Sequence, residues 1–136
     1  MKRYDGNKIL IQSLDELPHI PKSITDLYLD FETTSGQDDI NSLNPWKDCQ
    51  ILGAAFSWDD HKNSYYMPLR QRNMLDVESN LDIPKCNKYL QRLVQCSENW
   101  VNSNVKYDAH VGTISAGVDC SGINLIDLIT LAKLID

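Results

Sequence analysis

Apolar and polar residues alternate along several short segments of the chain, and this alternation predicts strands. The clearest segment is Asp26–Thr33, which is rich in β-forming residues. Cys49–Trp58 is typical of a buried strand, and Ser64–Leu69 of a strand that returns after a polar turn at 59–63. We therefore expect a hairpin, and Pro68 indicates that its second strand ends there or runs along a sheet edge.

The second half of the chain mixes helical and strand-like patterns. A helix is predicted over Pro84–Ser97, because Pro84 suits a first turn and five apolar residues recur at helix-face spacing. A short strand is expected at Trp100–Asn102, followed by a helix at Asp108–Ala116 that Gly117 ends. The five apolar residues of the first helix are Cys86, Tyr89, Leu90, Leu93 and Val94.

The last predicted elements are a short strand at Asn124–Ile126 and a helix from Leu128 onward, with Asp127 as its N-cap. Strands that meet in a hairpin and then alternate with helices indicate an α/β fold with a mixed sheet. The Asp26–Thr33 strand should lie centrally, with the Cys49–Trp58 strand antiparallel on one side. The strand near Trp100 should lie parallel on the other side, because a helix intervenes.

The domain organisation is simple, because 136 residues suffice for one domain at most. Residues 1–25 are polar apart from a strand-like patch at 8–12, and prolines punctuate residues 17–21. We therefore expect an N-terminal extension over 1–25 and one domain over 26–136.

Composition excludes some classes of protein without indicating a function. The apolar share of 42% allows a core, and the net charge of −6 argues against bulk attraction to nucleic acid. That charge is compatible with a nuclease whose acidic groups hold metal ions, because the ions then supply positive charge. The cysteines lack zinc-site spacing, and no segment suggests secretion or a membrane span, so we expect a soluble cytoplasmic protein with reduced thiols. The four cysteines are Cys49, Cys86, Cys96 and Cys120.

Asp30 and Glu32 are the first candidate site residues. Alternate residues of a strand point to the same face, about 6.5–7 Å apart along the backbone, so the two carboxylates share a face and Phe31 points to the other. Two carboxylates buried together are costly unless a cation is present, and magnesium and manganese favour such oxygen ligands. The alternative is two solvated acids on the polar face of an edge strand.

Asp108 is the second candidate. It lies where a predicted strand gives way to a predicted helix, and ligands of α/β sheets gather at the carboxyl ends of strands. The alternative is that Asp108 serves only as an acid at a helix N-terminus.

Other polar and aromatic residues have simpler explanations. A hairpin turn accounts for the run from Asp59 to His61 better than a metal site does. Scattered tryptophans are usually buried, and His110 should face away from Asp108 on the helix. The tryptophans are Trp46, Trp58 and Trp100.

Together, the two acidic segments resemble the DEDD family of 3′→5′ exonucleases, which have a ribonuclease H-like fold. The proofreading domains of bacterial and phage family A DNA polymerases are the most similar. Leu29–Thr34 is similar to the family's first exonuclease motif, and Asn104–Asp108 to its second, which has the pattern Asn-x-Lys-Tyr-Asp. Asp127–Asp136 is similar to the stretch that follows the second motif. The resemblance covers roughly 26–136, most of the chain.

The resemblance implies a two-metal site. Asp30 and Glu32 would bind two Mg²⁺ or Mn²⁺ ions at the scissile phosphate, and Asp108 would bind the second ion through water. One ion would activate the attacking water and the other would stabilise the leaving 3′ oxygen. The three carboxylates should then approach within about 8 Å of one another.

The resemblance also implies residues that hold the 3′ end of single-stranded DNA by stacking and hydrogen bonding. For two of them, Phe31 and Tyr107, core packing is the alternative. The residues concerned are Phe31, Thr33, Asn104 and Tyr107.

The chain departs from the family pattern in three places. The third motif, with a fourth acid and a Tyr or His that orients the water, does not occur up to Asp136, so the domain is expected to be C-terminally incomplete. Leu128 stands where threonine is common, and Gly36 where relatives place an apolar wedge at the 3′ base.

Three explanations of this incomplete domain follow. The chain could be an exonuclease module completed by a second polypeptide that carries Tyr-x-x-x-Asp, as in split phage polymerases, acting in the host cytoplasm. It could be an inactive remnant that acts as a structural or interaction partner. It could also be a piece of a longer DNA polymerase.

Overall fold

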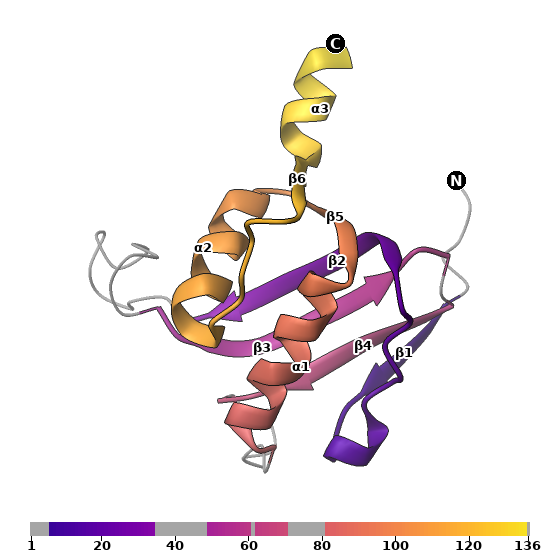
Figure 1. Ribbon diagram of the computed structural model, residues 1–136, viewed down its shortest axis with the longest axis vertical. Coiled ribbons are helices and arrows are strands. Elements are labelled where there is room, and N and C mark those ends of the chain that lie inside the picture. The colour runs from indigo at the N-terminus through magenta and orange to yellow at the C-terminus, as the bar shows by residue number, and fades with distance from the viewer. Residues whose placement is uncertain (1–5, 35–48, 61, 71–80, 136) are drawn as a thin grey trace.

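Six strands form one mixed sheet in the order β1-β4-β3-β2-β5-β6 (Figure 1). The computed structural model describes residues 6–34, 49–60, 62–70 and 81–135. The strands are β1 (Asn7–Leu10), β2 (Ile24–Thr33), β3 (Ile51–Trp58), β4 (Asn63–Pro68), β5 (Ser97–Asn102) and β6 (Asn124–Asp127). The helices are α1 (Ile83–Gln95), α2 (Val105–Ala116) and α3 (Leu128–Ile135), with a 3-10 turn, η1 (Leu14–Glu16).

The pairing around β2 confirms the predicted topology. β2 pairs antiparallel with β3 and parallel with β5, and β3 pairs antiparallel with β4 to complete the hairpin. β4 ends at Pro68, which has no N–H to continue the ladder. The mixed α/β class predicted from the sequence is therefore confirmed.

The segment before β2 is part of this sheet. β1 pairs parallel with β4, and Ile11 and Ile20 are buried in the common core. Since β2 begins at Ile24, the expected boundary between residues 25 and 26 falls within a strand.

Helices α1 and α2 cover the same face of the sheet (Figure 1). The five apolar residues predicted for the first helix are all buried in α1. Asp82 caps α1 by accepting a hydrogen bond from the backbone N–H of Lys85, 3.1 Å away. Gly112 of α2 lets the helix approach β2 closely, because a Cβ there would lie 3.1 Å from the Phe31 ring.

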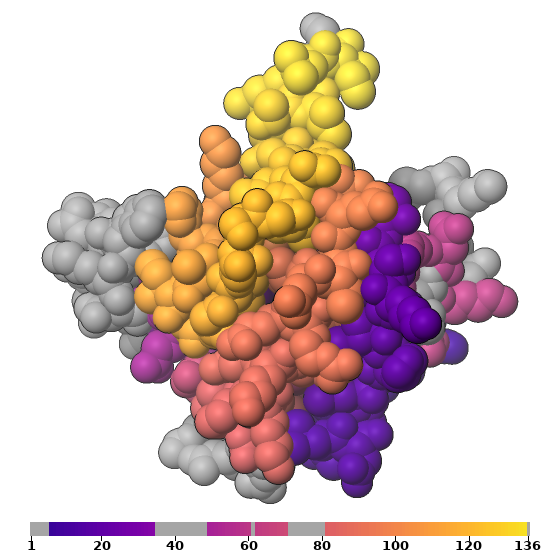
Figure 2. Space-filling model, viewed as in Figure 1, coloured from indigo at the N-terminus to yellow at the C-terminus, as the bar shows by residue number. Residues whose placement is uncertain are grey.

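β2 presents exposed side chains on the opposite face of the sheet, where Tyr28, Asp30 and Glu32 alternate with buried residues. α3 stands away from the sheet, beyond the end of β6 (Figures 1 and 2). Its apolar side chains are exposed, and Leu134 and Ile135 retain 78% and 84% of their accessible surface. Among the described residues, no helix is long and apolar enough to cross a membrane.

Candidate active site

The candidate site forms where β5, still paired with β6, parts from β2. The last residues that pair β2 with β5 are Leu27 and Trp100. Beyond them, backbone groups of β2 on the side of β5 form hydrogen bonds with side chains instead of with a strand. The Leu29 carbonyl accepts from the Trp100 indole N–H at 2.9 Å and from the Asn102 amide at 3.1 Å. The next free donor, the Phe31 N–H, donates to Oδ1 of Asp108 at 3.2 Å.

A left-handed turn at Asn104 carries the chain from β5 into α2. Asn104 has φ 58° and ψ 44°, a conformation that asparagine tolerates better than most residues. The helix begins at Val105, so the predicted start at Asp108 was wrong by three residues. Asp108 therefore lies in the first turn of α2, with its side chain directed at the β2 edge rather than capping the helix.

Asp30 and Asp108 converge on one side chain. Nδ2 of Asn102 donates to Oδ1 of Asp30 at 3.2 Å and to Oδ2 of Asp108 at 2.8 Å. Because one nitrogen contacts both oxygens, the two carboxylates lie within the 8 Å expected for this pair. The structure thus brings two acids from distant parts of the sequence to the carboxyl end of β5.

Asp108 is the buried member of the pair, with 2% of its surface exposed. Desolvation by burial, together with the nearby Asp30 carboxylate, raises the pKa of Asp108 to about 7, and the hydrogen bonds from Phe31 and Asn102 offset only part of this rise. Asp30 itself is exposed. One carboxyl group that favours its proton therefore faces a solvated one across the Asn102 amide.

The Glu32 side chain lies on the same face as Asp30 but is held toward β3 and β4. Its Oε2 accepts a hydrogen bond of 2.9 Å from the Tyr66 hydroxyl, which reaches across β3 from β4. Gly53 of β3 makes this contact possible, since a Cβ there would clash with the Tyr66 hydroxyl and lie 2.7 Å from Cζ of its ring. Within the described ranges, no group of three or more His, Cys, Asp or Glu side chains is arranged to hold a metal ion.

The residues expected to hold a 3′ end occupy different environments. Thr33 and Tyr107 share a hydrogen bond of 2.8 Å between their hydroxyls, and Cys49 Sγ lies 4.0 Å from the Tyr107 oxygen. Burial raises the pKa of Tyr107. Phe31 is buried and packs edge-on against Trp100, with ring centroids 6.0 Å apart, while the Asn104 side chain is exposed at its turn.

Asp127 links this region to α3. Its Oδ1 accepts from the backbone N–H of Ile129 at 2.9 Å, which confirms the predicted N-cap, and from the N–H of Asn104 at 3.4 Å. Leu128 lines a shallow hollow of about 240 Å³ on the open face of the sheet, together with Tyr28 and Asp30. The apolar start of α3 therefore lies next to the candidate site.

The other residues considered as candidates from the sequence have structural roles, wherever they lie in the described part of the chain. Asp59 adopts a left-handed turn, and its carboxylate accepts from the N–H groups of Thr25 and Asp26, as a hairpin turn predicts. Trp58 and Trp100 are buried, and His110 is partly buried in α2. Three sequence features lie outside the described residues: Gly36, Trp46 and His61.

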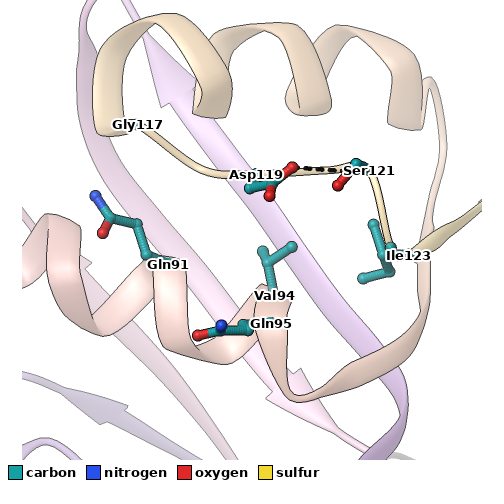
Figure 3. A pocket seen from close by; sticks show the side chains of 8 residues that line it. Gln91, Val94, Gln95, Gly117, Asp119, Ser121 and Ile123 are labelled. Atoms are coloured by element: carbon teal, nitrogen blue, oxygen red, sulfur yellow. Dashed lines mark hydrogen bonds between the residues drawn. The ribbon is translucent and has the colours of Figure 1, made fainter.

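A second pocket, of about 310 Å³, lies between α1 and the segment that follows α2 (Figure 3). Asp119, at its rim, accepts from the backbone N–H of Ser121 at 2.9 Å. Gln91 spans the two segments by donating to the Ala116 carbonyl at 2.7 Å. The first bond shapes the loop and the second joins α1 to the end of α2, so the polar groups at this pocket have structural roles.

Sequence reasoning missed Asn102 and Tyr66, which are the direct partners of the three acids. Both lie on segments predicted as strands; the only signal was a polar residue at the end of an apolar strand for Asn102 and a hydroxyl within the strand for Tyr66. A search of protein-family models finds none that matches this chain, and a search of curated proteins finds no significant match. The site's geometry and the two motifs are therefore the basis for assigning a function.

Proposed function

We propose that this chain belongs to a 3′→5′ exonuclease domain of the ribonuclease H-like DEDD type that hydrolyses phosphodiester bonds at the 3′ end of single-stranded DNA. The observation that carries the proposal is the convergence of Asp30 and Asp108 on Asn102. These acids come from the two segments that resemble the family's first and second motifs, and they meet beside the central strand. The mixed sheet, with β2 at its centre, is compatible with this fold.

Asp30 and Asp108 are the residues that fit a divalent ion best, because both are carboxylates and both contact the same Asn102 amide nitrogen. Glu32 is held by Tyr66 through one oxygen, and its side chain would have to turn toward Asp30 to join them. A bound Mg²⁺ or Mn²⁺ would activate water and stabilise the leaving oxygen. The hydroxyls of Thr33 and Tyr107 would orient the terminal nucleotide from the neighbouring strand end and helix.

A second candidate function is that of an inactive exonuclease-like partner of a DNA polymerase or of another polypeptide. Two observations favour it. Within the described residues, the acids do not form a group of three arranged for a metal ion. The exposed apolar side chains of α3 offer a surface for a protein partner.

A 3′-labelled single-stranded DNA assay with Mn²⁺ separates the two functions. The exonuclease proposal predicts release of the labelled nucleotide by the chain with any polypeptide encoded next to it, and loss of this release in Asp30→Ala. Glu98→Gln, an exposed acid on β5, is the matched control and should retain the wild-type rate. If neither the chain nor the mixture releases nucleotide although the mixture forms a stable complex, the partner function is correct.

A further inference from the structure

The Asn102 side chain is fixed in one orientation. Its Oδ1 accepts a hydrogen bond of 2.8 Å from the Ser103 N–H, and its Nδ2 faces three oxygens, those of Leu29, Asp30 and Asp108. A flipped amide would direct its carbonyl oxygen at two carboxylates and a backbone carbonyl, which is unfavourable. The network therefore assigns the nitrogen to the position between the two acids.

This position is the one that a cation shared by Asp30 and Asp108 would take. Asp108 is almost fully buried, and a carboxylate there requires either a positive ion or strong donors. An ion such as Mg²⁺ lies about 2.0–2.1 Å from its ligand oxygens. The amide nitrogen already lies 2.8 and 3.2 Å from the same two oxygens, so it leaves no room between them for an ion.

We propose that the amide of Asn102 stands in for a divalent cation between Asp30 and Asp108, and that an ion binds both carboxylates directly only when this side chain has moved away. The inference rests on the proposed function and adds a device that controls ion entry. Asn102 is thus a positioning residue: it holds the acids together without an ion and competes with the ion for them. Its removal should strengthen ion binding, although it weakens the ion-free protein.

The test is a titration with Mn²⁺ at pH 8, in which the electron paramagnetic resonance signal of the free ion measures how much Mn²⁺ is bound. Asn102→Ala should bind Mn²⁺ about tenfold more tightly than the wild type, because the ion no longer has to break the amide's bonds to two carboxylates. Asn102→Asp, which is nearly isosteric, should bind more tightly still and should show a larger Mn²⁺-induced rise in melting temperature. It also serves as the test if Asn102→Ala does not fold.

Asn99→Ala is the matched control, because Asn99 lies on the same strand and donates to a single acid, Asp26, at 3.0 Å. It should leave the Mn²⁺ affinity unchanged. Equal or weaker binding by the Asn102 variants, with wild-type binding that still depends on Asp30, would overturn the inference and leave the proposed function intact. Binding that is the same in wild type and Asp30→Asn would instead refute the metal site.

Discussion

At the scale of single residues, Asp108 is unusual because its partners are neutral donors although it is almost fully buried. The Phe31 N–H and the Asn102 amide occupy one oxygen each, and Asp30 adds a nearby negative charge. Hydrogen bonds to the charged form compensate only part of the desolvation. The proton on Asp108 is therefore linked to the stability of the fold.

That linkage predicts a stability that falls as the pH rises. The folded protein keeps the Asp108 proton up to a pKa of about 7, whereas the unfolded chain releases it near the ordinary value of 3.8. The contribution is thus complete below the ordinary value and is lost progressively as the pH rises from there through about 7, on the order of 4 kcal/mol in all. Urea unfolding in EDTA between pH 5 and 8 follows the larger part of this loss.

Asp108→Asn is the matched variant, and its unfolding free energy should change much less over this range. Mn²⁺ added at pH 8 should stabilise the wild type, because it binds the ionised carboxylate. A slope that persists unchanged in Asp108→Asn would assign the effect to another group.

The contact between Gly53 and Tyr66 predicts a second residue-level effect. Gly53→Ala should cost about 1–3 kcal/mol, because the new Cβ forces the Tyr66 ring away from Glu32. Tyr66→Phe should cost about 0.5–1.5 kcal/mol, the value of one hydrogen bond. Urea unfolding of the double variant should show a cost below the sum of the two single costs. The reason is that the Tyr66 hydroxyl, with which the new Cβ would clash, is absent from phenylalanine. Strict additivity would mean that the two residues do not interact.

At the scale of elements, the turn between β5 and α2 determines where Asp108 lies. Asn104 is left-handed, and only Ser103 and Asn104 separate the end of β5 from the start of α2, so the helix starts close to the sheet. Asparagine and glycine accept this conformation, whereas β-branched residues do not.

Variants of Asn104 should therefore separate folding from binding. Asn104→Gly should unfold within about 1 kcal/mol of the wild type, whereas Asn104→Val should lose about 1–2 kcal/mol. If the side chain holds the 3′ nucleotide, fluorescence anisotropy with labelled single-stranded DNA will show weaker binding for Asn104→Gly despite its intact fold. Wild-type affinity in that variant would confine Asn104 to its role in the turn.

At the scale of the whole molecule, α3 is the element with the least support from the rest of the fold. Its exposed apolar residues stand beyond the sheet, next to a hollow on the open face. A helix of eight residues is marginal without packing. Such a surface favours association with a partner or with a second copy.

We expect concentration-dependent self-association of the pure chain, measured by sedimentation equilibrium. Changing both Leu134 and Ile135 to Lys should abolish it at little cost in stability, because these side chains are already exposed. Ile114→Lys, at an exposed position in α2, is the control and should associate like the wild type. Association that survives the double change would place the interface elsewhere.

The periodicity of apolar residues predicted most of the fold. The features that it did not predict depend on contacts between residues far apart in the sequence. The α1 face and the order of β2, β3 and β5 follow from local patterns and short connections. The place of β1 does not, because it depends on pairing with β4 more than 50 residues away. Asp30 and Asp108 were found through their motifs, whereas the roles of Asn102 and Tyr66 depend on which side chains the folded sheet places opposite them.

The hydrogen bond between the Phe31 N–H and Asp108 also makes that amide a built-in spectroscopic probe. Its partner is a carboxylate rather than a strand carbonyl, so its proton chemical shift should move downfield as Asp108 ionises. Neighbouring amides of β2 that are bonded to β3 should stay nearly unchanged. A single cross-peak in a nitrogen–proton correlation spectrum would then follow both the titration of the site and the arrival of an ion, without any substrate.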